Sequence, residues 1–142
     1  MKNFSIQMID HHVSSEWWKA IIGHFVKVGD SIEIRCWKEE ANEITCAECY
    51  GKAIDAGNEV SVSAVVTDAL IKELMSEEQR YENLYNKMTK YFTINVKNEC
   101  CDFCSAHYGT EMYITIHADS DIAFFENAMG KYTEDEFSIG EW

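Results

Sequence analysis

Short segments in which apolar and polar residues alternate recur along this chain, and this pattern constrains its fold more than any other feature. Residues 4–9 (FSIQMI) and 31–37 (SIEIRCW) alternate in this way. The other strand-like segments are EVSVSAVVT (59–67), YFTINVKN (91–98) and EMYITIHA (111–118). Because successive side chains of a strand point to opposite faces of a sheet, a period of two is typical of half-buried strands. The sequence therefore predicts several strands with one buried face each.

Helical periodicity separates these strands. Within residues 14–30, Trp17, Ile21 and Phe25 recur at intervals of four behind a serine that can cap a helix. The same spacing predicts the longest helix over residues 68–90, and a last short helix over 120–130 (SDIAFFENAMG).

The segment EITCAECY, residues 43–50, is predicted to return as a strand beside residues 31–37 after a polar turn. The element order is then β-α-β-β-β-α-β-β-α. This order predicts an α+β fold, with a mostly antiparallel sheet and helices packed on one side.

Composition predicts a single domain over residues 1–142. Hydrophobic residues make up 46% of the chain, enough for a core, and no proline occurs that could mark a Pro-rich linker. The first residues, MKNFSIQMIDHH, lack the apolar core of a secretory signal, and no apolar run reaches membrane-spanning length. We therefore expect a cytoplasmic protein that does not bind membranes.

Two Cys-x-x-Cys pairs are the first candidate site. They are Cys46 with Cys49 and Cys101 with Cys104, separated by 51 residues. Four thiolates at this spacing can form the closed tetrahedral site of a structural zinc ion, and His107 is a candidate substitute ligand. The stretch CAECYG resembles the metal knuckle of zinc-ribbon proteins, where a glycine often follows the second cysteine. A structural zinc is therefore one interpretation, although no cofactor is required.

Packed thiols are the alternative interpretation, because cysteine is often buried as a small hydrophobic residue. Redox chemistry is disfavoured. A thioredoxin-like site needs the pair at a helix N-terminus, and neither pair precedes a helical pattern. Glu99 and Asp102 beside the second pair would also raise the pKa of its thiols.

Charge indicates the kind of partner. Twelve basic and 25 acidic residues give a net charge of −13, which argues against nucleic-acid binding and favours a basic protein partner. Acids and aromatics gather in the C-terminal segment 132–142, and the candidate contact residues there are Glu134, Asp135, Glu136, Phe137 and Trp142. A frayed, solvated tail is the alternative for this segment. A competing surface is the predicted helix face with Glu73, Glu77, Glu78 and Glu82.

Catalytic signatures are absent from the sequence. No G-x-S-x-G, H-E-x-x-H, P-loop or G-x-G-x-x-G motif occurs, and the carboxylates are too dispersed to nominate an acid–base pair. We therefore expect that the protein is not an enzyme.

A small, strongly acidic, single-domain α/β chain without a catalytic motif resembles the immunity proteins of bacterial polymorphic or contact-dependent toxin systems. This resemblance is one of type and transfers no residue. It implies that the protein binds one cognate toxin domain, often a basic nuclease, and occludes the active site of that toxin. The alternative function is a zinc-stabilised adaptor or regulatory module that depends on the four cysteines.

Overall fold

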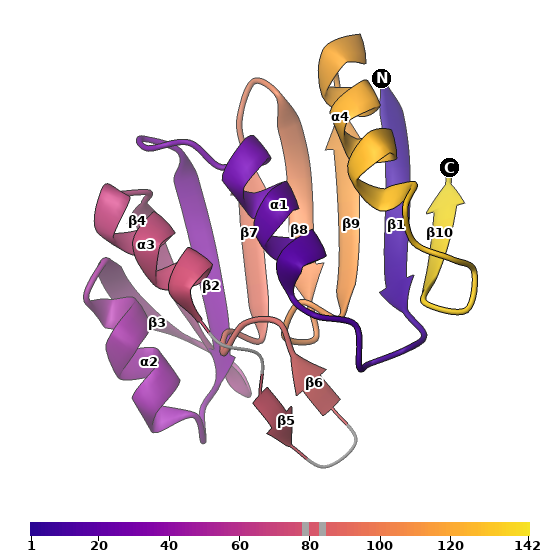
Figure 1. Ribbon diagram of the computed structural model, residues 1–142. Helices are drawn as coiled ribbons and strands as arrows, with labels where there is room; N and C mark the ends of the chain where they lie inside the picture. Colours follow the sequence, from indigo (N-terminus) through magenta and orange to yellow (C-terminus); the bar gives the residue numbers. More distant parts are fainter. Residues whose placement is uncertain (78–79, 83–84) are drawn as a thin grey trace.

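Eight strands form one antiparallel sheet in the order β10-β1-β9-β8-β7-β2-β4-β3 (Figure 1). The computed structural model describes residues 1–77, 80–82 and 85–142. The strands of the sheet are β1 (Lys2–Met8), β2 (Ser31–Trp37), β3 (Gly51–Ala56), β4 (Glu59–Val65), β7 (Thr93–Lys97), β8 (Cys101–Ala106), β9 (Glu111–Ile116) and β10 (Phe137–Glu141). A separate hairpin pairs β5 (Arg80–Glu82) with β6 (Tyr85–Lys87). The predicted α+β fold with a mostly antiparallel sheet is confirmed.

The helices of the described residues pack on the same side of the sheet (Figure 1). They are α1 (Glu16–Phe25), α2 (Ala41–Glu48), α3 (Asp68–Ser76) and α4 (Asp119–Met129). The strands bury alternate side chains beneath these helices, as β2 does with Ile32, Ile34 and Cys36. The apolar stripe of α1 contributes five buried residues to the same core: Trp17, Trp18, Ile21, Ile22 and Phe25. The core therefore lies between one sheet face and the helix layer, and the opposite sheet face carries no helix formed by the described residues.

The structure corrects two predicted elements. Residues 43–50 do not form a strand, because Ala41–Glu48 is helix α2, which packs Ile44 and Ala47 against the core. In so short a segment, Ile44 and Cys46 fit the period of a strand while Ile44 and Ala47 fit that of a helix, and the helix-favouring residues around them decide the outcome.

The predicted helix over 68–90 ends at Ser76, and the described residues beyond it include the β5–β6 hairpin. No strand is predicted between residues 98 and 111, yet Cys101–Ala106 forms the central strand β8, and the C-terminal segment adds the edge strand β10. Among the described residues, no helix is long and apolar enough to cross a membrane.

Candidate functional site: the open face of the sheet

The helix-free side of the sheet, called the open face below, presents a row of aligned side chains. Strand register places one residue from each strand side by side, because every pairing is antiparallel and in continuous register. From β3 to β10 this row contains Lys52, Ser63, Glu33, Asn95, Cys104, Tyr113, Ser5 and Gly140. The row is mostly polar, which suits a surface that meets solvent or a partner.

Glu33 on β2 organises the centre of the open face. One carboxylate oxygen, Oε2, accepts hydrogen bonds from Ser61 Oγ at 2.5 Å and from Arg35 Nη1 at 3.0 Å. The other, Oε1, accepts one from Asn95 Nδ2 at 2.9 Å. Arg35 Nε in turn donates to Glu59 at 3.1 Å. Three neighbouring strands are thereby tied together by side chains, so this part of the surface is ordered before any partner arrives.

The pKa of Glu33 follows from these contacts. Partial burial raises the pKa, but the hydrogen bonds from a hydroxyl, an amide and a guanidinium group outweigh it and hold the pKa of Glu33 below its usual value. The carboxylate is therefore charged at neutral pH and acts only as an acceptor.

We expect the Glu33→Gln variant to be less stable than the wild type at neutral pH, and the difference to vanish in acid. Because the folded-state pKa of Glu33 is lowered, its ionised form contributes stability above the unfolded pKa, and this contribution is lost as pH falls through the folded pKa. Urea denaturation of both proteins at a series of pH values measures the difference. A gap in unfolding free energy that persists or widens as pH falls would contradict the assignment.

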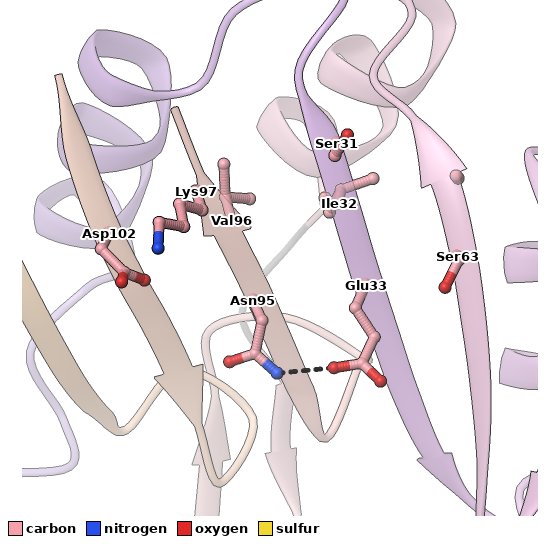
Figure 2. Close-up of a pocket in the computed structure, with 9 residues that line it drawn as sticks. Ser31, Ile32, Glu33, Ser63, Asn95, Val96, Lys97 and Asp102 are labelled. Atoms are coloured by element: carbon pink, nitrogen blue, oxygen red, sulfur yellow. Dashed lines mark hydrogen bonds between the residues drawn. The ribbon is translucent and has the colours of Figure 1, made fainter. Parts of the chain in front are cut away.

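Two open depressions lie side by side on the open face. The first has a volume of about 430 Å³ and is lined by Ser31, Ile32, Glu33, Ser63, Ala64, Asn95, Val96, Lys97 and Asp102 (Figure 2). The second, of about 210 Å³, is lined by Asn95, Asp102, Phe103, Cys104, Tyr113, Ile114, Thr115 and Trp142. Asn95 and Asp102 line both. The two depressions therefore make one shallow groove across β4, β2, β7, β8 and β9.

Exposed aromatic residues stand at one end of this groove. Tyr113 is 45% exposed, and the C-terminal residue Trp142 is 70% exposed. The backbone of Trp142 is fixed to β1, because its N–H donates to Asn3 O at 2.9 Å and its carbonyl oxygen accepts from Asn3 Nδ2 at 3.0 Å. The chain terminus is thus anchored beside the groove and is not a frayed tail.

The C-terminal contact residues predicted from the sequence lie in different environments in the structure. Glu134 and Asp135 are exposed in a turn between α4 and β10. Glu136 stabilises this turn, since its carboxylate accepts a hydrogen bond from the backbone N–H of Thr133 at 2.9 Å.

Phe137 and Trp142 have opposite environments. Phe137 is only 3% exposed and packs edge-on against Trp17 in the core, which corrects the expectation that Phe137 is available to a partner. The alternation of side chains along a strand explains this, because the apolar residue of an edge strand turns toward the core. Trp142 is the member of the set that lines the groove.

In the second acidic surface predicted from the sequence, Glu73 and Glu77 bind other residues of the same protein. Glu73 accepts a hydrogen bond from the Tyr91 hydroxyl at 2.6 Å, and Lys90 Nζ lies 3.6 Å from the carboxylates of both Glu73 and Glu77. Burial raises the pKa of Glu77. Of the other two acids, Glu78 lies outside the described residues, and Glu82 lies in β5 rather than on a helix. Glu73 and Glu77 therefore make contacts within the protein, whereas the sequence predicted that they share a helical face that contacts a partner.

The structure does not bring the four paired cysteines together. Cys46 and Cys49 lie at the end of α2, on the helix side of the sheet. Cys101 is buried on the helix side of β8, whereas Cys104 lies in the open-face row. Among the residues that the structure describes, no group of three or more His, Cys, Asp or Glu side chains could hold a metal ion. Zinc binding stays a prediction, which metal analysis of the purified protein can test.

Burial also makes the second pair poor nucleophiles. It raises the pKa of Cys101 to about 12, with a smaller contribution from the neighbouring thiol of Cys100, and it raises the pKa of Cys104. Because the thiolate is the reactive form, these thiols are largely protonated at neutral pH. Their environment fits packed thiols better than redox chemistry.

Sequence reasoning missed most of the groove. Glu33, Asn95 and Tyr113 occupy polar positions of predicted strands and no motif marks them, while Asp102 lies inside the second Cys-x-x-Cys pair. Three of these residues, Glu33, Asn95 and Tyr113, alternate with buried apolar residues in segments that were predicted as strands. That alternation was the available signal, since residues opposite the core face must share the other face of the sheet.

Comparisons with protein-family models, with curated protein sequences and with solved structures found no match to this chain.

Proposed function

We propose that this protein is an immunity protein that binds a cognate bacterial toxin domain through its open face and thereby occludes the toxin's active site. The carrying observation is the groove of the open face, which is preorganised by Glu33 and flanked by the exposed aromatics Tyr113 and Trp142. It acts without catalysis or a required cofactor, in the cytoplasm, where the toxin would otherwise reach its target.

Charge supports this choice of partner. The net charge of −13 creates a negative field that speeds encounter with a basic protein such as a nuclease. Rigid aromatic residues at the contact then slow dissociation, because they bury a large area at a low cost in conformational entropy. A fixed sheet face loses little freedom on binding, which further favours a tight complex.

The test is co-expression with the product of the neighbouring upstream gene. We expect that gene product alone to arrest growth, this protein to restore growth, and the two purified proteins to form a one-to-one complex in size-exclusion chromatography. A double variant, Tyr113→Ala with Trp142→Ala, should lose protection, whereas Val28→Ala, at a 58% exposed site in the loop before β2, should retain it. A neighbour with neither toxicity nor binding would remove the support for this function.

A further inference from the structure

The second depression combines exposed aromatic rings with hydrogen-bond acceptors that point the same way. Asn95 Nδ2 is held by Glu33, so its carbonyl oxygen Oδ1 is directed away from Glu33 toward β8 (Figure 2). Thr115 Oγ1 donates its hydrogen to Asn3 Oδ1 at 2.6 Å, which leaves the hydroxyl oxygen itself as an acceptor. The amide and the hydroxyl are therefore both oriented by neighbours outside the depression, and both offer lone pairs to it.

Asp102 supplies a charge to the same place. It is exposed, lines both depressions, and makes no ion pair within 4.0 Å among the described residues. Lys97, its register partner on β7, extends toward it (Figure 2). The Lys97 ammonium group therefore lies beyond ion-pair distance of the Asp102 carboxylate, and this carboxylate is accessible to an incoming group.

Aromatic residues complete the site. The Tyr113 hydroxyl donates to Glu111 at 3.3 Å, which turns its hydrogen away from the depression, and Trp142 is fixed through its backbone to Asn3. A cation is attracted to the face of such rings, and a guanidinium group is planar and so can also stack on them.

We propose that the second depression seats an arginine side chain of the partner protein. The guanidinium group donates to the Asp102 carboxylate and to Asn95 Oδ1 while it stacks against Trp142 or Tyr113. Arginine fits better than lysine because several separated acceptors and a flat aromatic wall match a planar group with five N–H donors. This inference deepens the proposed function and rests on it for the statement that the partner is a protein.

The test uses this protein alone, with N-acetyl-arginine-N-methylamide as the probe and NMR shifts of backbone amides and of the Trp142 indole as the readout. We expect saturable shifts confined to residues 95, 102–104, 113–115 and 142. The matching citrulline derivative has the same shape without the charge and should cause none, and the lysine derivative should bind more weakly. Shifts that are dispersed over the surface, or that are equal for citrulline, would overturn the proposal, and equal shifts for lysine would overturn its preference for arginine.

Variants sharpen the same experiment. Asp102→Asn should weaken binding of the arginine probe about tenfold, since a charge-assisted hydrogen bond is lost. Lys97→Met should strengthen binding, because it removes a competing cation. Asp55→Asn is the control: this carboxylate is 73% exposed, forms an ion pair with Lys38 at 3.0 Å, and lies on the helix side of the sheet by its register with Val60. If the Asp102→Asn variant binds the arginine probe as tightly as the wild type does, the proposed arginine site is wrong. Complex formation with the toxin would still stand as a separate result.

Discussion

The Asp102→Arg variant is expected to lose binding to the basic toxin partner, with a dissociation constant raised about 100-fold or more. A positive charge placed in the groove would face the partner's own cation, and like charges juxtaposed in an interface cost several kcal/mol, which corresponds to this factor. Isothermal titration calorimetry with the purified toxin domain, inactivated by mutation, measures the change. Because Asp102 is exposed and makes no ion pair among the described residues, the fold should tolerate the substitution.

Two further charge reversals decide which surface makes the contact. Asp55→Arg lies on the helix side and should change the dissociation constant by no more than about threefold, as expected for a distant, screened charge. Asp135→Arg lies in the turn before β10, where the sequence pattern also predicts a contact. A large loss for Asp135→Arg combined with none for Asp102→Arg would move the interface from the open face to that turn.

The Gly109→Ala variant is expected to lose about 3 kcal/mol of unfolding free energy, through a positive φ and a steric clash together. Gly109 has a φ of +81° and is buried beneath α1, where an added Cβ would lie 2.7 Å from Met88 Cβ and 2.8 Å from Trp18 Nε1. The Trp18 indole cannot yield easily, since its N–H donates to the buried Ser105 hydroxyl at 3.0 Å.

Gly57→Ala is the matched control for this substitution. Gly57, in the turn between β3 and β4, has a similar φ of +77°, but an added Cβ there has no neighbour within 4 Å. It should lose only the conformational component, about 1 kcal/mol. Urea denaturation of the two variants separates the steric part from the backbone part. Equal losses would show that the packing around Trp18 adapts.

The alternation in β1, β2, β4, β7 and β9 was sufficient to predict these strands and the α+β class, because burial of one sheet face forces a period of two. The amphipathic helices α1 and α4 were predictable for the same kind of reason. Helix α2 was not, because its eight residues are too few for the two periods to be told apart.

The candidate site was less predictable than the fold. The C-terminal segment looked like one acidic and aromatic surface, yet Phe137 enters the core, Glu136 holds a turn, and Trp142 reaches the open face. Likewise, Cys101 and Cys104 form one motif in the sequence but lie on opposite sides of β8.

By itself, the sequence determined the local periods, the net charge of −13 and hence the basic character expected of a partner. The tertiary structure decided which residues meet. Asn95, Asp102 and Tyr113 lie on three consecutive strands, and Trp142 lies after a further helix; all four become neighbours because the register of β7, β8 and β9 and the fixed position of Trp142 align them. Period and charge are local or additive properties of residues, whereas strand order and register depend on how the whole core closes.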